Sequence, residues 1–266
     1  MNFDSILSQT IDAAKQAGSF IRSEINKFSK SDIEIKGKND LVSYVDKTSE
    51  KLIIASLIDV IPNAGFLAEE SHNTINESLE YKWIIDPLDG TTNYLHGLSP
   101  YSVSIALMHH NEVILGVVYE VSNDECFYAT KAKGSFLNGE KITCSTNSKI
   151  SESLFVTGFP VSRFYRNKES FELLDYIIKN SHGIRRLGSA AADLAYVACG
   201  RFDCFYEYDL KSWDVAAGSL IVTEAGGKVS DFNGEDNYVF GKEIVAANSL
   251  IFVKTLQIIE KFMRSK

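Results

Sequence analysis

The chain has 266 residues, enough for one large domain or two small ones, and 45% of them are hydrophobic, which is ample for a substantial core. Its formal net charge of -8 argues against nucleic acid as the main partner, because a phosphate backbone attracts basic surfaces. No apolar run is long enough to cross a bilayer, so we expect no membrane partner.

The cysteines favour a reducing compartment. None of Cys126, Cys144, Cys199 and Cys204 forms a C-x-x-C pair, and no histidine cluster accompanies them. We therefore expect reduced thiols rather than a disulfide frame or a zinc site. Asp4 lies where a signal peptide would need a basic start, so we expect the protein in the cytoplasm.

Two helices are predicted near the start of the chain. Apolar residues recur at helical spacing over 3–28, which indicates one long amphipathic helix. The polar stretch 30–40 predicts a loop, and a second apolar helical pattern over 41–61 stops at Pro62. Asp46 fits the N-cap of this second helix, which is the usual role of an aspartate there, and a functional role stays open.

Several strands follow, and the first of them ends in two acids. Residues 65–70 predict a short strand whose last residues, Glu69 and Glu70, would point to opposite faces. These acids are either a solvated pair or include one glutamate that faces a metal ion. An antiparallel meander is then predicted from strands at 83–86, 102–110, 113–121 and 125–130, with a further hairpin turn at Asn138-Gly139.

The second half of the chain alternates strands and helices, as is typical of an α/β sandwich. The expected strands are 154–159, 183–188, 202–208, 228–232 and 243–248. The expected helices are 169–180, 190–199, 213–226 and a final helix that runs to residue 264. No Pro-rich or Ser-rich linker separates residues 1–150 from 151–266, so we expect two halves that pack closely, the second closing a site on the first.

The stretch WIIDPLDGTTNYLHG at 83–97 is the most informative part of the sequence. Its first three residues predict a buried strand, which ends in Asp86 and Asp89. Pro87 turns the chain between them, which would bring both carboxylates together and expose the Leu88 carbonyl. Hard cations such as magnesium take carboxylate and carbonyl oxygens together, so this stretch predicts a cation site.

The next residues predict a place for phosphate beside the cations. Gly90 and the two threonines after it predict a turn that opens a helix, and helix N-termini bind anions. Two divalent ions roughly 3.5–4 Å apart can hold the attacking and leaving oxygens of a phosphate ester. Glu69 would supply a third acid and Asp214 a fourth, although Asp214 considered alone is better explained as an acid at a helix start.

The spacing of the two aspartates excludes a related chemistry. Phosphatases of the haloacid dehalogenase type carry D-x-D-G-T after a buried strand and use the first aspartate as the nucleophile. Here the pattern is D-x-x-D-G-T, which is one residue longer and moves the first carboxylate relative to the turn. Covalent catalysis by Asp86 is therefore not expected, and water is the better nucleophile.

Three segments together resemble the signatures of the inositol monophosphatase family of metal-dependent phosphatases. They are GFLAEE, WIIDPLDGTTNYLHG and WDVAAGSLIVTEAGG, and LVSYVDKTSE and LGSAAADLAYVACGRFDCFYE also match the family pattern. The resemblance covers nearly the whole chain in the expected order. It implies an α/β fold built as a five-layer α/β/α/β/α sandwich, and magnesium-dependent hydrolysis of phosphomonoesters. It also favours functional roles for Asp46, Glu69 and Asp214.

The resemblance implies a role for each matching residue. The first magnesium ion would be held by Glu69, Asp86 and the Leu88 carbonyl, the second by Asp86, Asp89 and Asp214, and a third, weaker ion would lie near Glu69. Glu70 and Thr91 would orient the attacking water, with Asp46 hydrogen-bonded to the Thr91 hydroxyl. The implied substrate-binding residues are Asp89, Gly90, Thr91, Thr92, Gly188, Ser189, Ala190, Glu207 and Asp214.

The resemblance leaves the substrate open among small phosphorylated compounds. Inositol monophosphate is the first expectation. Family members also act on fructose 1,6-bisphosphate, histidinol phosphate or 3'-phosphoadenosine 5'-phosphate, and a metal-binding regulatory protein without turnover is the alternative from another functional class. Inhibition by lithium and a homodimer are implied by the family as well.

Overall fold

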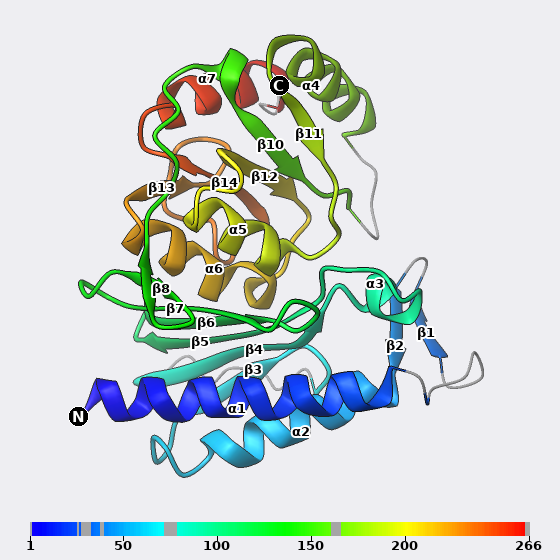
Figure 1. Cartoon of the computed structure of the whole chain (residues 1–266), viewed down its shortest axis with the longest axis vertical. Helices are drawn as coiled ribbons and strands as arrows, with labels where there is room; N and C mark the ends of the chain where they lie inside the picture. Colours follow the sequence, from blue (N-terminus) through cyan, green and yellow to red (C-terminus); the bar gives the residue numbers. More distant parts are fainter. Residues whose placement is uncertain are drawn as a thin grey trace.

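Five layers of secondary structure stack on one another in the order helix, sheet, helix, sheet, helix (Figure 1). The structure is a computed structural model that describes residues 2–25, 27, 33–37, 40–71, 79–160 and 166–263, with 33–37 and 40–42 as backbone. The longer helices are α1 (Phe3–Glu24), α2 (Tyr44–Leu57), α4 (Asn167–Asn180), α5 (Ala190–Ala198), α6 (Ser212–Glu224) and α7 (Phe252–Met263). The expected five-layer sandwich is confirmed.

The first sheet has seven strands, in the order β3-β4-β5-β6-β7-β8-β9. Their bounds are β3 (Gly65–Ala68), β4 (Tyr81–Asp89), β5 (Ser102–His109), β6 (Glu112–Glu120), β7 (Glu125–Thr130), β8 (Ser135–Leu137) and β9 (Glu140–Ile142). Strands β4 to β9 form the expected antiparallel meander, whereas β3 pairs with β4 in parallel. The ends of β3 and β4 therefore lie at the same edge of the sheet.

The second sheet has five strands, in the order β11-β10-β12-β14-β13. Their bounds are β10 (Leu154–Thr157), β11 (Gly183–Arg185), β12 (Cys204–Tyr208), β13 (Gly227–Ser230) and β14 (Glu243–Asn248). Strand β10 runs parallel to β11 and β12, while β14 runs antiparallel to β12 and β13. The alternation of strands and helices expected for the second half is thus present, and the sheet is mixed.

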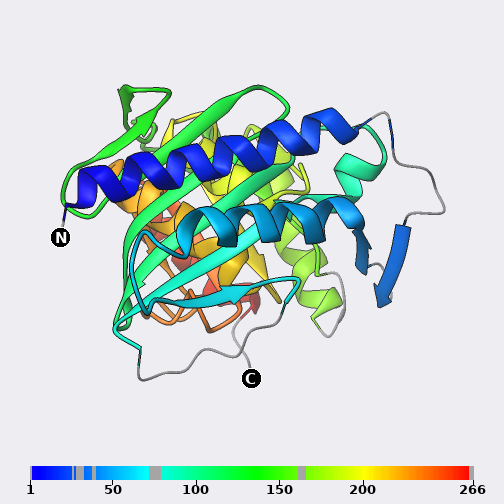
Figure 2. The ribbon, with the colours of Figure 1, turned by 90° about the horizontal axis from the view of Figure 1, so that it is seen from below.

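Three hydrophobic cores fill the spaces between the layers. The amphipathic face of α1 packs with α2 on the outer face of the first sheet, where Figure 2 shows the two helices side by side. Helices α5 and α6 lie between the sheets in a core that includes Phe127 from the first sheet and Phe205 from the second. Helices α4 and α7 cover the far face of the second sheet. The middle core therefore joins both sheets.

Two expectations for the start of the chain need correction. The first helix ends at Glu24 rather than at residue 28, which lies outside the described residues. The stretch 30–40, expected as a loop, contains β1 (Ile33–Gly37), which pairs antiparallel with β2 (Asp40–Ser43). The apolar residues alternate with polar ones before Gly37, a period-2 pattern that the polar composition of the stretch obscured.

Two further observations concern the cysteines and the helices. Cys126, Cys144, Cys199 and Cys204 are all free, so no disulfide joins them. Within the part of the chain that the structure describes, every helix is too short or too polar to meet the requirements for crossing a membrane.

Candidate active site

The two aspartates of β4 converge because the strand is irregular between them. Asp86 pairs with Ser104 on β5 and Asp89 pairs with Ser102. The register therefore shifts by one residue, because an advance of three residues along β4 corresponds to only two along β5. The irregularity contains Pro87, which has no N–H group to donate to the ladder. The Leu88 N–H group instead donates to Asp86 Oδ1 at 3.0 Å. Both carboxylates therefore border the same cavity, as the proline predicted.

The parallel strand β3 brings Glu69 to the same place. Ala68 pairs with Ile85, and the Glu69 N–H group donates to the Ile85 carbonyl at 3.2 Å, so Glu69 follows β3 directly beside Asp86. The strand ends before the two glutamates, whose backbone forms a turn. Glu69 borders the cavity, and the Glu70 N–H group donates to Glu50 Oε2 at 2.7 Å.

The turn after β4 requires a glycine. Gly90 has a φ of 90°, a conformation that side chains disfavour, and it precedes the short helix α3 (Thr91–Leu95). A Cβ atom at Gly90 would lie 3.0 Å from the Pro100 carbonyl oxygen and 3.2 Å from that of Gly188. The turn between Asp89 and Thr91 is therefore pressed against the segment that leads into α5.

Asp46 connects helix α2 to this turn. Thr91 Oγ1 lies 3.0 Å from Asp46 Oδ1 and 2.9 Å from the Leu88 carbonyl oxygen, and it can donate its one proton to either. The N–H and hydroxyl groups of Ser43 donate to the other oxygen of Asp46, at 2.8 and 2.7 Å. The expected hydrogen bond between Asp46 and Thr91 is present. The expected N-cap role is wrong, because Ser43 is the N-cap and Asp46 completes its capping box from the third helical position.

The second half of the chain contributes Asp214 from the first turn of α6. Its Oδ2 accepts a hydrogen bond of 2.6 Å from the Lys211 N–H group, so the residue also serves the helix start. The neighbouring Trp213 carbonyl accepts a hydrogen bond of 3.0 Å from Ser104, the β5 residue that pairs with Asp86. This contact fixes the beginning of α6 against the strand beside Asp86.

The start of α5 is fixed in a similar way. Asp89 Oδ2 accepts hydrogen bonds from Ser189 Oγ at 2.6 Å and from the Ala191 N–H group at 2.8 Å. Ser189 is also the N-cap of α5, and its hydroxyl lies 3.0 Å from that of Ser102 on β5. The carboxylate of Asp89 is therefore shared between the end of β4 and the N-terminus of a helix from the second half of the chain.

All of the predicted metal-binding and substrate-binding residues line one cavity of about 320 Å³. They are Glu69, Asp86, Leu88, Asp89, Gly90, Thr91, Thr92, Gly188, Ser189, Ala190, Glu207 and Asp214. Of the predicted catalytic residues, Thr91 is part of this lining, whereas Asp46 and Glu70 are not, and Asp46 contacts the lining through Thr91. Acids that are far apart in the sequence are thus brought together.

Burial and mutual repulsion raise the pKa values of these acids. Burial raises the pKa of Asp86 well above its usual range, and the charges of Glu69, Asp89 and Asp214 raise it further. Burial raises the pKa of Asp89 to about 6, against hydrogen bonds from Ser189 and Ala191 that lower it. Burial and the charge of Asp89 raise the pKa of Asp214 to about 8. Such a group of buried and half-buried carboxylates has the ligand chemistry that a hard divalent cation needs.

The acids surround the cavity without closing on one another. Among the described residues, the ligand atoms that lie within 4.8 Å of one another in a group of three belong to Glu80, His109 and His110, at a different place in the fold. Repulsion between carboxylates opposes a closer approach of Asp86 and its neighbours, and a cation would remove that repulsion.

Two residues of the site were not predicted from the sequence. Arg186 lines the cavity, and its positive charge lowers the pKa values of Asp89 and Glu207, although burial raises that of Glu207 to about 8. Gly158 also lines it, and a Cβ atom there would lie 2.1 Å from Glu207 Oε2. A glycine directly after a strand can mark such a close approach, whereas an arginine beside another arginine carries no comparable signal.

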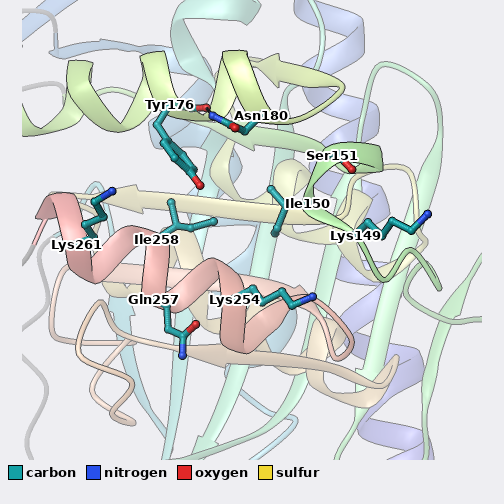
Figure 3. Close-up of a pocket in the computed structure, with 9 residues that line it drawn as sticks. All are labelled: Lys149, Ile150, Ser151, Tyr176, Asn180, Lys254, Gln257, Ile258 and Lys261. Carbon is teal, nitrogen blue, oxygen red and sulfur yellow. Dashed lines mark hydrogen bonds between the residues drawn. The ribbon is translucent and has the colours of Figure 1, made fainter.

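A cavity of about 580 Å³ lies elsewhere, between α4, α7 and a short 3₁₀ helix, η2 (Ile150–Glu152) (Figure 3). Its polar lining includes Lys149, Lys254 and Lys261 but no carboxylate. It therefore lacks the ligands for a magnesium ion, and the acid-lined cavity is the better candidate for catalysis.

Comparisons with known proteins identify the family of this chain. Residues 2–264 match the model of the inositol monophosphatase family. A putative Nus factor SuhB from Neisseria meningitidis serogroup A is 40% identical over 254 residues, which are 95% of this chain and 97% of that protein. An inositol-1-monophosphatase from Mesorhizobium japonicum is 37% identical over 97% of each chain. The solved structure of an inositol monophosphatase from Anabaena matches with a TM-score of 0.87 and 33% identity over 98% of each chain. This chain belongs to the inositol monophosphatase family.

Proposed function

We propose that the protein is a magnesium-dependent phosphomonoesterase that hydrolyses a phosphorylated polyol, with inositol monophosphate as the first candidate. One observation carries the proposal. Four carboxylates from both halves of the chain, those of Glu69, Asp86, Asp89 and Asp214, line a single cavity beside the turn at Gly90. This set of oxygen donors suits two divalent cations and a phosphate group between them.

The membership of the chain in the family suggests the ligand set, and all of its residues line the cavity. Glu69, Asp86 and the Leu88 carbonyl would hold one magnesium ion, and Asp86, Asp89 and Asp214 would hold the other. A third and weaker ion would lie near Glu69. When bound, the ions lower the pKa of water and neutralise charge on the phosphate and on the leaving oxygen.

Thr91 in the lining, together with Asp46 and Glu70, would orient the attacking water. If Thr91 donates its proton to Asp46, the lone pairs of its hydroxyl oxygen are left to accept a hydrogen bond from water. The pair of hydrogen bonds from Ser43 keeps the Asp46 carboxylate in place for this role. Glu70 would accept the second hydrogen bond of the water and draw off its proton.

The opposite wall of the cavity would hold the alcohol part of the substrate. Polar groups at Ser189, Glu207 and Arg186 line it, together with the backbone of Gly188 and Ala190. Carboxyl oxygens can accept and, when protonated, donate hydrogen bonds to the hydroxyl groups of a polyol. The N–H groups of Gly90 and Thr91, with Thr92 beside them, would hold the phosphate.

Phosphate release with and without magnesium tests the proposal. Asp86→Asn keeps the shape of the side chain but removes the charge shared by both proposed ions, so we expect a loss of activity on the order of 10²-fold or more. Asp175→Asn is a matched control, because Asp175 is a surface acid of α4 paired with Lys179. Equal activity of the Asp86→Asn variant and the wild type would rule out the proposed site.

A substrate panel tests the finer assignment. It contains inositol 1-phosphate, fructose 1,6-bisphosphate, histidinol phosphate and 3'-phosphoadenosine 5'-phosphate. We expect the highest kcat/KM for inositol 1-phosphate, and a higher value for another member would move the assignment to that compound. Lithium should inhibit the enzyme, and sedimentation should give the mass of a homodimer. Fractionation of cells should place the protein in the cytoplasm.

The names of some relatives support a second candidate function. The relative from Neisseria meningitidis is named a putative Nus factor, so an interaction role without turnover stays a candidate for this chain. The lysines of the cavity in Figure 3 favour it, because they form a local cationic surface on an acidic protein. Absence of magnesium-dependent phosphate release across the whole panel would favour this role over catalysis.

A further inference from the structure

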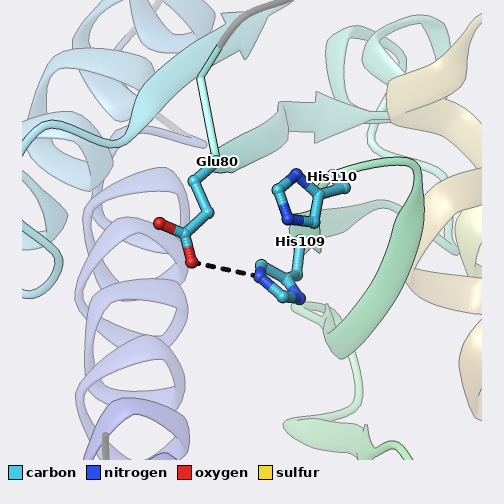
Figure 4. Close-up of side chains that lie close together, drawn as sticks. All are labelled: Glu80, His109 and His110. Carbon is cyan, nitrogen blue, oxygen red and sulfur yellow. Dashed lines mark hydrogen bonds and ion pairs between the residues drawn. The ribbon is translucent and has the colours of Figure 1, made fainter.

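A second group of potential metal ligands lies at the other end of β4, where Glu80, His109 and His110 meet (Figure 4). We propose that these three side chains form a binding site for one transition-metal ion of the zinc class. The inference is independent of the proposed phosphatase activity, because it uses none of the residues of the acid-lined cavity.

The backbone brings the three residues together. Tyr81 pairs with His109 in the β4–β5 ladder, and the His110 N–H group donates to the Glu80 carbonyl at 2.7 Å, which extends the pairing by one residue. His110 has a φ of 52° and lies in the two-residue turn, 110–111, that precedes β6. Both histidines and Glu80 are thus fixed on two hydrogen-bonded chain segments rather than on a free loop.

Ring contacts restrict the imidazoles further. The rings of Tyr81 and His109 are stacked with their centroids 4.6 Å apart, and the rings of His109 and His110 lie 4.4 Å apart. Figure 4 shows the Glu80 carboxylate directed at His109, with the His110 ring above it. Side chains that are already positioned lose less conformational entropy when they bind an ion.

The spacing of the ligand atoms suits a tetrahedral ion. His109 Nε2 lies 3.2 Å from Glu80 Oε1, and the ligand atoms of all three residues lie within 4.8 Å of one another. Ligands about 2.0–2.2 Å from a tetrahedral zinc ion are about 3.4 Å apart, so small side-chain rotations would complete the geometry. Three protein ligands leave one position for water or another small ligand.

Space is available beside the proposed site. His109 and His110 also line a cavity of about 810 Å³, bounded on its other side by residues near the end of α6 and by Tyr238 and Phe240. Side chains of Glu80 and His110 are exposed, and that of His109 is half-buried, so an ion can reach the site from solvent.

Distance and ligand chemistry separate this site from the proposed magnesium site. Glu80 precedes Asp86 by six positions, which along an extended strand corresponds to about 20 Å. Two imidazoles and one carboxylate favour zinc, copper or nickel, whereas the all-oxygen set of the acid-lined cavity favours magnesium. The protein would therefore bind a zinc-class ion near one end of β4 and magnesium near the other end.

Zinc titration in excess magnesium tests the proposal. The full chain is titrated with Zn²⁺ against a chromophoric chelator, and the imidazole protons are followed by NMR. We expect one zinc ion per chain, with the signals of His109 and His110 shifted and those of His96 and His182 unchanged. The same result is expected in the Asp86→Asn background, which separates this site from the acid-lined cavity.

Two variants remove ligands with little change to the backbone. Asparagine adopts the left-handed region readily, so His110→Asn should keep the turn, and Glu80→Gln keeps the side-chain shape. Loss of a group that merely supports a ligand costs about tenfold or more in metal affinity, so each variant should bind zinc at least about tenfold more weakly. His182→Asn is the control and should bind zinc as the wild type does.

Unchanged zinc affinity in both ligand variants would overturn the proposal, as would zinc-induced shifts confined to His96 or His182. The contact between Glu80 and His109 would then be only a surface ion pair.

Discussion

One threonine hydroxyl joins three parts of the candidate site. Thr91 lies on the turn after β4, and its hydroxyl is within hydrogen-bond distance of Asp46 on α2 and of the Leu88 carbonyl. The same carbonyl is a proposed magnesium ligand. A change at Thr91 should therefore affect catalysis more than stability.

Replacement of Thr91 by valine removes the hydroxyl but keeps the shape. We expect kcat to fall by about 10²-fold or more, since a group that positions a proton acceptor or donor typically contributes that much. Stability should change by only about 1 kcal/mol, the usual net contribution of one hydrogen bond. Thr91→Ser, which keeps the hydroxyl, should recover most of the activity. Similar kcat values for the valine variant and the wild type would show that the hydroxyl does not orient the water.

Individual residues differ in how well the sequence predicted them. Asp86 and Asp89 were predictable because a buried apolar run, a proline and a glycine surround them within a few positions. Arg186 was not predictable, because its proximity to Asp89 and Glu207 depends on how β11 leads into α5. The group of Glu80, His109 and His110 was missed for a similar reason, since β4–β5 pairing joins residues 29 positions apart.

At the scale of elements, the starts of two helices from the second half are joined by hydrogen bonds to β4 and β5. Ser189 is the N-cap of α5 and donates its hydroxyl proton to Asp89, so one side chain links the helix to the end of β4. The helices themselves were predictable from their apolar patterns. Their docking against β4 and β5 was not, because it depends on single contacts such as that of Ser104 with the Trp213 carbonyl.

Removal of the Ser189 hydroxyl tests this link. Ser189→Ala should lower the free energy of unfolding by about 1 kcal/mol, as expected for the loss of an N-cap, and should also weaken magnesium binding through Asp89. Urea unfolding and a magnesium titration of activity measure the two effects. Removal of the cap that opens α2, by Ser43→Ala, should affect stability and the Asp46–Thr91 contact instead. A Ser189→Ala variant with unchanged magnesium dependence would contradict the link.

The parallel pairing of β3 is the element-scale feature that the sequence left undecided. Residues 65–70 were expected as a strand, but a strand pattern does not say whether it runs parallel or antiparallel to its neighbour. Parallel pairing with β4 places Glu69 beside Asp86, whereas antiparallel pairing would have put it at the far edge of the sheet. The position of Glu69 in the proposed metal site therefore depends on the direction in which β3 pairs with β4, and the local residue pattern does not determine that direction.

At the scale of the molecule, the site lies where two sheets share one core. The middle core includes residues of β4, β12, α5 and α6, so the acids on either side of the cavity are attached to one packed unit. The five-layer order followed from the resemblance and is confirmed here. The expected division at residue 150 stays a prediction.

The acids that line the cavity make the metal-free protein sensitive to pH. The folded-state pKa of Asp89 is about 6, and those of Glu207 and Asp214 are about 8, all above the values of the free side chains. The folded chain therefore binds these protons more tightly than the unfolded chain, and their contribution to stability is lost as the pH rises from about 4 to about 8. Each such group contributes about 1.4 kcal/mol per pH unit while the two states differ by one proton.

Thermal unfolding with chelator and with magnesium checks this expectation. In chelator, the melting temperature should fall between pH 5 and pH 8, and magnesium should raise it most at the upper end of that range. A melting temperature that magnesium leaves unchanged at pH 8 would mean that the acids are not compensated by a cation.

The central claim is that acids from both halves of the chain hold the same divalent cations during phosphate ester hydrolysis. The magnesium dependence of phosphate release by the Asp214→Asn variant measures this most directly, because Asp214 is the only proposed metal ligand from the second half. We predict that the variant needs at least about tenfold more magnesium for half-maximal activity than the wild type and reaches a lower maximal rate. A magnesium curve that coincides with that of the wild type would contradict the account.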